Sequence, residues 1–312
     1  MSARNIFLTG GTGYIGLNVV AELCKRGLTV TALTRKPLEL PGCRTVVGDL
    51  ANIGTIAHEI AAAGAIIHLA SSRSCQPDLM KSDIVATENL IQAWRNGPFL
   101  LASSAVVGGW GPEPLSEQTP ARVSSAYTLG KICNEFQLRV AQSLDHRGPA
   151  IMLRPAGLFI STNHRRHSRQ RFSILYQQCL QNCKFVFLSE EGLEIYGSSF
   201  IGGADFARAA ADALNMTVSG SYNVAGGFCT WKLLIETINR IAGTRSDFII
   251  RQNGGVESGE FLLPQSRTCL DDTAFKTQVG FIPQQSLEQL VEEFVAADRV
   301  HVAEKPKSNA AI

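Results

Sequence analysis

The amino-acid sequence predicts an α/β protein in which a doubly wound parallel sheet is accompanied by a smaller α+β lobe in the carboxyl-terminal half. Two observations support this prediction. Over residues 1–160, short apolar runs of strand type alternate with segments whose apolar residues recur at helical spacing, a pattern typical of βαβ units. In addition, a glycine-rich turn, GGTGYIG at residues 10–16, joins the first strand to the first helix.

The expected elements follow each other in the order that such a sheet requires. Asn5–Thr9 is an apolar strand, and Tyr14–Arg26 repeats apolar residues as a helix does. Further strands are predicted at Leu28–Thr34, Thr45–Gly48, Ala65–Ala70, Phe99–Ser103 and Ala150–Arg154. Further helices are predicted near Ile53–Ala63, Ile84–Arg95, Ser125–Ser143, Phe172–Gln181 and Leu287–Asp298.

The glycine turn matches a dinucleotide-binding fingerprint. Gly11, Gly13 and Gly16 satisfy G-x-G-x-x-G in the strand–turn–helix context that the motif requires. Glycine permits the tight turn and lets backbone N–H groups approach a pyrophosphate, whose charge the helix dipole stabilises. We therefore expect a Rossmann-type dinucleotide-binding domain over residues 1–160, with parts of 195–230 returning to it. Residues 161–302 are expected to form mainly a substrate-binding lobe, and residues 303–312 a flexible tail.

The end of the second strand indicates which dinucleotide is bound. An acidic side chain at this point accepts hydrogen bonds from the adenosine ribose, whereas a nearby arginine accommodates a 2′-phosphate. Thr34 occupies the acidic position here, and Arg35 and Lys36 follow it. A guanidinium group is suited to forked contacts with phosphate oxygens. NADP(H) is therefore expected in preference to NAD(H), the alternative being that Arg35 and Lys36 are a solvated basic pair at a strand end.

A second group of residues carries acid–base chemistry. Tyr127 and Lys131 are four residues apart in a predicted helix, so both side chains lie on one face. A free tyrosine has a pKa of about 10 and is a poor acid–base catalyst near neutrality unless a neighbouring cation stabilises its phenolate. Lys131 can supply that charge, and Ser104, at the end of a strand, can hydrogen-bond the same substrate oxygen. Taken alone, this spacing also occurs on ordinary exposed helix faces.

The composition sets the outer limits on partners. Of 312 residues, 45% are hydrophobic and 18% charged, and the net charge of +2 provides no general drive toward nucleic acid or an acidic membrane. Eight cysteines are scattered, and Cys179 and Cys183 have no further ligands near them in sequence to complete a metal site. No apolar run is long enough to span a bilayer. These features predict a soluble cytoplasmic protein with free thiols and no metal.

The chain resembles the extended short-chain dehydrogenases/reductases, the superfamily of nucleotide-sugar epimerases and related reductases. Beyond GGTGYIG and YTLGK, similar landmarks follow in the usual order: VVGDL (46–50), IIHLA (66–70), DIVATENLIQA (83–93), LRPAGLF (153–159), DFARAAADAL (205–214) and SYNVAGG (221–227). The resemblance implies a catalytic triad of Ser104, Tyr127 and Lys131. It also implies a homodimer through helices around 79–95 and 125–143. The residues expected to bind the cofactor are Gly10, Gly13, Tyr14, Ile15, Gly16, Arg35, Lys36, Asp49, Leu50, Ala70, Lys131, Arg154 and Pro155.

Several positions depart from the family pattern. Gly108-Gly109 replaces a usual Tyr-Gly, and Asp83 stands where an asparagine is common. Ala105-Val106 replaces the Asp-Glu pair of the sugar dehydratases, which disfavours dehydration. His68 lies inside an apolar run and is interpreted as a hydrogen-bonded core residue. The basic segment 161–171, with four arginines and two histidines, is either a lid that grips an anionic group or a solvated loop.

These features favour an NADP(H)-dependent oxidoreductase that reduces a carbonyl, or oxidises the alcohol, of a small metabolite. Two alternatives remain. A nucleotide-sugar 4-epimerase or 4-ketoreductase would use the same triad, although the family's epimerases typically keep an acidic residue where Thr34 stands. A non-catalytic NADP-sensing protein would use the fold alone, but such proteins generally lose the Tyr127–Lys131 pair. The substrate itself is not identified by the sequence, because substrate choice resides in the irregular carboxyl-terminal segments.

Overall fold

A seven-stranded parallel sheet forms the larger part of the molecule in the computed structural model, which describes residues 5–71, 80–144, 147–163 and 170–303. The strand order is β10 (Gly220–Val224), β6 (Ala150–Pro155), β5 (Phe99–Ala102), β4 (Ala65–His68), β1 (Asn5–Thr9), β2 (Thr29–Thr34) and β3 (Arg44–Val47). Every neighbouring pair is parallel. The predicted doubly wound fold is confirmed, and β10 returns from far along the chain to form one edge.

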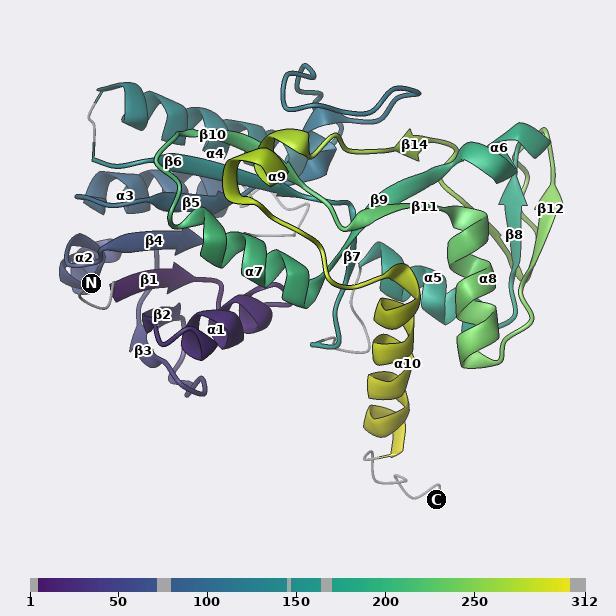
Figure 1. The fold of residues 1–312 in the computed structure, drawn as a ribbon, viewed down its shortest axis with the longest axis horizontal. Coiled ribbons are helices and arrows are strands. Elements are labelled where there is room, and N and C mark those ends of the chain that lie inside the picture. The colour runs from purple at the N-terminus through teal and green to yellow at the C-terminus, as the bar shows by residue number, and fades with distance from the viewer. Residues whose placement is uncertain (1–4, 72–79, 145–146, 164–169, 304–312) are drawn as a thin grey trace.

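The sheet is buried on both faces because its strands carry apolar side chains on both sides. In β1, Ile6 and Leu8 pack on one face and Phe7 on the other, as the alternation of side chains along a strand requires. Helices α1 (Gly16–Lys25) and α7 (Gly203–Ala213) cover the first face. Helices α2 (Ala57–Ala61), α3 (Ala86–Ala93) and α4 (Ala126–Leu144) cover the second (Figure 1).

The helix boundaries differ in detail from those expected. The segment predicted as one helix over Ile53–Ala63 is a short 3-10 turn, Ile53–Thr55, followed by α2. The Asn52 side chain accepts a hydrogen bond from the Gly54 amide and so begins the 3-10 turn separately. A π-helical turn over Met80–Val85 precedes α3. Such a turn is rare and is frequent at functional sites.

The carboxyl-terminal lobe contains two small sheets. In the four-stranded sheet, β9 (Gly197–Gly202) pairs with β7 (Leu158–Ile160), β11 (Gly227–Thr230) and β14 (Arg267–Thr268). In the three-stranded sheet, β8 (Lys184–Phe187) lies between β12 (Asp247–Ile250) and β13 (Glu260–Leu262). The helices here are α5 (Arg171–Leu180), α6 (Glu190–Ile195), α8 (Trp231–Ala242) and α10 (Leu287–Ala303), and α9 (Thr273–Val279) contacts β10.

The aromatic core of the lobe is separate from those of the large sheet. Phe172 and Tyr176 of α5 pack edge-on against Phe294 of α10, and Trp231 of α8 is buried in the same cluster. In Figure 1 the large sheet's strands point toward this lobe, so their carboxyl ends face it. Ligands of open α/β sheets bind outside that edge, where the strand order reverses. In this sheet the reversal falls between β1 and β4.

Two predicted segments fall largely beyond what the structure describes. Residues 164–169 of the basic segment, including His164 and His167, lie outside the described residues, as do residues 304–312 of the predicted tail. Arg171, counted in that basic segment, is the first residue of α5, and its guanidinium lies 5.7 Å from the centroid of the Trp231 ring.

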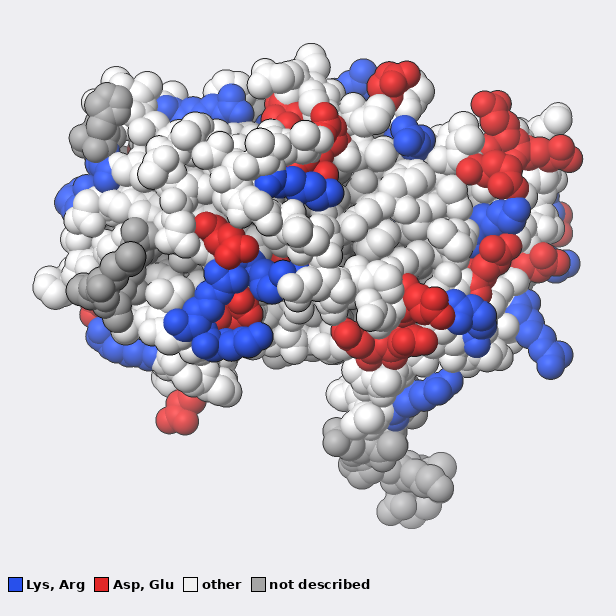
Figure 2. Space-filling model, in the orientation of Figure 1, with Lys and Arg blue, Asp and Glu red and all other residues white. Residues whose placement is uncertain are grey.

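Charge and membrane features can be assessed over the described parts of the chain. None of the helices described is long and apolar enough to cross a membrane. In the described ranges, no group of three or more His, Cys, Asp or Glu side chains is placed to hold a metal ion. On the face shown in Figure 2, acidic and basic side chains are interspersed, in keeping with a net charge of +2.

Candidate active site

At two positions the glycine turn packs so closely against backbone atoms that a side chain would not fit. Gly10 has a φ of 75°, and a Cβ there would lie 2.6 Å from the Ala70 amide nitrogen. A Cβ on Gly16 would lie 2.1 Å from the Gly10 carbonyl oxygen. The Gly13 amide donates to that same oxygen at 3.0 Å, which closes the turn. Glycine is therefore required at Gly10 and Gly16, and the turn leads directly into α1.

The amino terminus of α1 has the character of an anion site. Ile15 precedes the helix without a side-chain cap, and the first turn carries no acidic residue. Gly13 is exposed, and Tyr14 and Ile15 are half-buried. The Tyr14 hydroxyl donates to the Phe159 carbonyl at 2.9 Å, which ties the turn to β7. These features fit a dinucleotide pyrophosphate, because helix-terminal N–H groups and the helix dipole favour negative charge.

The residues expected at the adenosine end lie at the ends of β2 and β3. Thr34 is buried and donates to the Val46 carbonyl at 3.3 Å, whereas Arg35 and Lys36 are exposed. The exposed Asp49 follows β3 and accepts from the Ala51 amide at 2.9 Å. Leu50 is buried, and its carbonyl oxygen accepts from Asn89 Nδ2 at 2.8 Å. The exposed cationic side chains of Arg35 and Lys36 therefore stand beside the end of β2.

A buried histidine connects three elements beneath the turn. His68 of β4 lies 2.6 Å from Thr9 Oγ1 through Nδ1 and 3.0 Å from Thr87 Oγ1 through Nε2. Thr9 Oγ1 in turn accepts from the Ala70 amide at 3.3 Å. Burial, with a contribution from the Lys131 charge, lowers the pKa of His68 to about 3. His68 is therefore a neutral, hydrogen-bonded core residue, as the sequence indicated.

The three predicted catalytic residues lie on two elements that pack together. Helix α4 carries Tyr127 and Lys131, and it contacts the 3-10 turn η3 (Ala105–Gly108), which begins directly after Ser104. Lys131 is buried, donates to the Ala102 carbonyl at 2.8 Å and places Nζ 5.8 Å from the centroid of the Tyr127 ring. Tyr127 and Ser104 are half-buried. The ammonium group is thus held beside the phenol at the carboxyl edge of the sheet.

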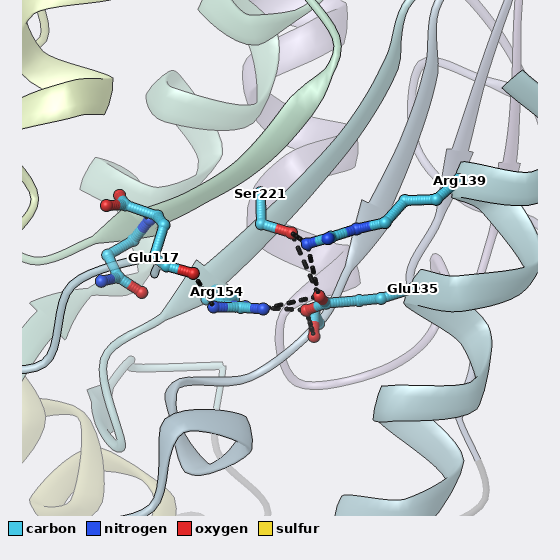
Figure 3. Close-up of polar contacts among 7 residues, drawn as sticks. Glu117, Glu135, Arg139, Arg154 and Ser221 are labelled. Atoms are coloured by element: carbon cyan, nitrogen blue, oxygen red, sulfur yellow. Dashed lines mark hydrogen bonds and ion pairs between the residues drawn. The ribbon is translucent and has the colours of Figure 1, made fainter. Parts of the chain in front are cut away.

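One turn further along α4, Glu135 forms the centre of a buried polar network. Arg154 of β6 donates to both carboxylate oxygens, from Nε at 2.8 Å and Nη2 at 2.7 Å. The Ser103 hydroxyl donates to the same carboxylate at 2.5 Å, and the Ser221 hydroxyl at 3.0 Å. Figure 3 shows Glu135 reaching from the helix to Arg154 and Ser221, with Arg139 extending from the same helix toward Ser221.

The charge state of this network follows from its contacts. Burial alone raises the pKa of Glu135, but the hydrogen bonds and charge of Arg154, with those from Ser103 and Ser221, outweigh it and lower the pKa overall. Glu135 is therefore ionised. Arg154 was expected to bind cofactor, yet its donors reach Glu135 and, at 3.4 Å, the Glu117 carbonyl. Its contribution to cofactor binding stays a prediction, as does that of Pro155, the last residue of β6.

Sequence reasoning missed these networks because their members are far apart in the chain. Glu135, Arg154 and Ser221 come from α4, β6 and β10, and Ser103 directly follows β5. One usable signal was present, since Glu135 stands four residues after Lys131 and must share its helix face. The departures noted above lie nearby: Asp83 is buried and accepts from the Ser71 hydroxyl at 3.1 Å. Gly109 has a φ of 77°, which suits glycine there.

A known protein family matches most of this chain. A model of the NAD dependent epimerase/dehydratase family matches residues 6–225, which include the glycine turn, the Tyr127–Lys131 helix and all seven strands of the large sheet apart from Asn5, the first residue of β1. The chain belongs to this family.

Curated relatives of this family member are dehydrogenases and reductases by name. It is 27% identical over 176 residues to a 3-beta-hydroxysteroid dehydrogenase of Mycolicibacterium neoaurum, covering 49% of this chain and 47% of that one. It is 35% identical over 94 residues to a putative dihydroflavonol 4-reductase of Synechocystis, covering 27% of each. The matched region spans about half or less of the length of these relatives.

Solved structures match over nearly the whole chain at low identity. A short-chain dehydrogenase/reductase superfamily protein of Agrobacterium tumefaciens with bound NAD has a TM-score of 0.79 at 20% identity, covering 96% of this chain and 99% of that one. The UDP-glucose 4-epimerase of Thermotoga maritima has a TM-score of 0.77 at 18% identity, covering 96% and 99%. At such identities the likeness establishes the shared fold.

Proposed function

We propose that this protein is an NADP(H)-dependent oxidoreductase of the extended short-chain dehydrogenase/reductase type. It reduces the carbonyl of a small metabolite, or oxidises the corresponding alcohol. The observation that carries the proposal is the buried Lys131 ammonium beside the Tyr127 ring, on a helix that begins at the same sheet edge as the glycine turn. A cation paired with a phenol at a dinucleotide site supports acid–base work on a substrate oxygen.

The chain's own residues divide the chemistry among them. The dinucleotide, when bound, supplies the hydride or accepts it. During reduction, the Tyr127 hydroxyl donates a proton to the substrate oxygen, and the Lys131 charge stabilises the phenolate that remains. Ser104 donates a hydrogen bond to the same oxygen and holds it in line with the tyrosine. In the oxidative direction the Tyr127 phenolate removes that proton.

NADP(H) is favoured over NAD(H) because of the end of β2. Arg35 and Lys36 are exposed there, and the buried Thr34 hydroxyl is occupied by the Val46 carbonyl. A carboxylate that would bind the ribose hydroxyls is therefore replaced by a hydroxyl directed into the sheet. The adjacent guanidinium supports recognition of a 2′-phosphate.

The names of curated relatives favour net oxidation or reduction over epimerisation. A ketoreductase of Stigmatella aurantiaca, named for a farnesylated dihydroquinoline oxide, is 29% identical over 98 residues, and the 3-beta-hydroxysteroid dehydrogenase described above matches 176 residues. The 4-epimerases, by contrast, match as folds at 18–20% identity. Free thiols in the described chain are consistent with the reducing cytoplasm as its compartment.

The decisive experiment measures NADPH consumption with a panel of ketones and aldehydes, sterol-like and smaller. The wild-type protein should oxidise NADPH with at least one of them. Tyr127→Phe should lower kcat by about 100-fold or more, because it removes the proton donor and leaves the ring in place. Tyr196→Phe makes the same change in the lobe and should leave turnover intact.

Other outcomes point to the alternatives. Turnover that survives Tyr127→Phe would exclude the acid–base role. Dinucleotide that stays bound through purification, with no net NADPH consumption and interconversion of sugar epimers, would indicate an epimerase. Tight NADPH binding with no turnover of any carbonyl or sugar would indicate a sensing protein.

We also propose a homodimer through the outer faces of α3 and α4. Exposed apolar side chains gather there on α4, with Phe136 59%, Val140 53% and Leu144 80% exposed. They line a groove of about 560 Å³ between the two helices, with Ile84 and Ile91 on the other side. Apolar groups gathered in this way are typical of an interaction surface, and a second copy can cover both helices at once.

A further inference from the structure

Two hydroxyl groups donate to the buried Glu135 carboxylate from opposite sides of β6. Ser103 donates at 2.5 Å from the end of β5, and Ser221 donates at 3.0 Å from β10. Ser103 is 3% exposed, so its bond to the carboxylate is shielded from water. The two hydroxyls share an acceptor but stand in different places relative to the candidate catalytic residues.

Ser103 is adjacent to Ser104, whereas Ser221 lies in a strand that carries none of the residues assigned to the site. The Ser103 amide also donates to the Leu153 carbonyl at 2.8 Å, so its backbone continues the pairing with β6. Beyond Ser103 the chain leaves the sheet and enters the η3 turn. The hydrogen bond from the Ser103 side chain to Glu135 therefore fixes the chain immediately before Ser104.

Glu135 is anchored independently of either serine. Arg154 holds its carboxylate through two hydrogen bonds, at 2.8 and 2.7 Å. Such a bidentate pair fixes the orientation of both partners. Because Glu135 follows Lys131 by one turn of α4, the carboxylate has a set position relative to Lys131 and Tyr127.

We propose that the Ser103–Glu135 hydrogen bond is a positioning contact that sets Ser104 against the Tyr127–Lys131 pair. The inference rests on the proposed function. The Ser103–Glu135 hydrogen bond joins helix α4 to the segment that carries Ser104, and the side chains of both must meet at one substrate oxygen. Ser103 acts through Ser104 and does not touch the substrate. Catalytic groups must be held within a fraction of an ångström, because a misplacement of about 1 Å can cost about 100-fold in rate.

Removing Glu135 or Arg154 would be a poor test of this contact. Either change leaves a buried charge unpaired, which strongly destabilises a protein and can prevent folding. The serines avoid the problem, since Ser→Ala at either position leaves the ion pair in place. They form a matched pair with the same substitution and the same acceptor, Ser103 directly after β5 and Ser221 in β10.

The test compares Ser103→Ala with Ser221→Ala in the full-length protein. Each is assayed for kcat, KM for the carbonyl, the Kd of NADPH by fluorescence, and Tm. Ser103→Ala should lower kcat about 10-fold or more, while the Kd of NADPH changes less than about 2-fold, because the glycine turn is untouched. Ser221→Ala should change kcat less than about 2-fold at a similar shift in Tm. Ser103→Thr, which keeps the hydroxyl, should recover most of the lost turnover.

The outcomes separate this inference from the proposed function. Equal effects of Ser103→Ala and Ser221→Ala on kcat would overturn the positioning role while leaving the reductase proposal intact. A loss of NADPH binding in Ser103→Ala as large as its loss of kcat would also overturn it, since that result indicates a general structural role. A wild-type protein that reduces no carbonyl would reject both proposals together.

Discussion

Individual residues at the sheet edge are constrained by backbone contacts in some places and by charge in others. Gly10 and Gly16 cannot carry a Cβ without colliding with backbone atoms of Ala70 and Gly10. The Arg35 side chain, by contrast, is exposed at the end of β2. The backbone therefore requires the two glycines of the proposed dinucleotide site, whereas Arg35 can be replaced to test the proposed preference for NADP(H).

Replacing Arg35 should change cofactor preference and leave stability unaffected. In Arg35→Ala, the KM for NADPH should rise about 10-fold or more, because a charge-assisted hydrogen bond to phosphate contributes about 1.5–3 kcal/mol. The KM for NADH should change much less. Steady-state kinetics with both cofactors measure the difference. Arg95→Ala is the control. It also removes one positive charge, but Arg95 follows α3 at the amino edge of the sheet, so the preference for NADPH should be preserved.

A result contrary to this prediction has a clear meaning. Equal increases in KM for NADPH and NADH would indicate that Arg35 contacts the adenine or the pyrophosphate. No change in either would indicate that Arg35 and Lys36 are a solvated pair.

At the scale of elements, the proposed site residues are placed by contacts between strands and helices. Helix α4 carries Tyr127, Lys131 and Glu135 on its sheet-facing side, at successive turns. His68 links β4 to β1 through Thr9 and to α3 through Thr87. A neutral imidazole therefore joins β4, β1 and α3, and Thr9, which it contacts, directly precedes the glycine turn.

The neutral state of His68 predicts a pH dependence of stability. Its pKa is about 3 in the folded protein and 6.5 when unperturbed, so between these values the unfolded chain binds the additional proton. This contribution to stability is complete above pH 6.5 and is lost as the pH falls toward 3. The slope is up to about 1.4 kcal/mol per pH unit, or about 2 kcal/mol between pH 6.5 and 4.5.

Urea unfolding of wild type and His68→Gln at several pH values checks this prediction. The free energy of unfolding should decline less for His68→Gln between pH 6.5 and 4.5, whatever its value at neutral pH. Glu135 does not interfere, because its lowered pKa makes its contribution fall only below about pH 4.5. His58→Gln alters an exposed histidine and should retain the wild-type slope. Identical slopes for wild type and His68→Gln would show that the imidazole is not buried in the neutral form.

For the whole molecule, the arrangement of faces separates the site from the surface proposed for dimerisation. The carboxyl edge of the large sheet faces the lobe (Figure 1). The apolar groove between α3 and α4 lies on the outer side of those helices, away from the strands they cover. Helix α4 therefore carries proposed site residues on one side and exposes Phe136 and Val140 on another.

A charge placed in this groove should dissociate the dimer. Val140→Glu places a carboxylate where two apolar surfaces would meet, and its burial without a partner costs several kcal/mol. Sedimentation velocity should show a dimer for wild type and a monomer for Val140→Glu. Val256→Glu introduces the same charge at an exposed valine in the lobe and should remain dimeric. Wild-type protein that sediments as a monomer would refute the proposed dimer.

The local pattern of the sequence was sufficient for much of this structure. Alternating apolar runs predicted the strands from β1 to β6, since strand and helix periodicities are properties of neighbouring residues. The spacing of Tyr127 and Lys131 likewise predicted that they share a helix face. The glycine turn was recognisable because its geometry is set within seven residues, 10–16.

Only the tertiary structure decided which distant residues meet. The Glu135 network joins positions 103, 135, 154 and 221, and the His68 contacts join positions 9, 68 and 87. Buried polar groups must find hydrogen-bond partners, but the sequence does not state which ones, because that choice depends on how strands and helices pack. For the same reason, Arg154 could be read as a cofactor ligand from the sequence, and its pairing with Glu135 emerged only in the folded chain.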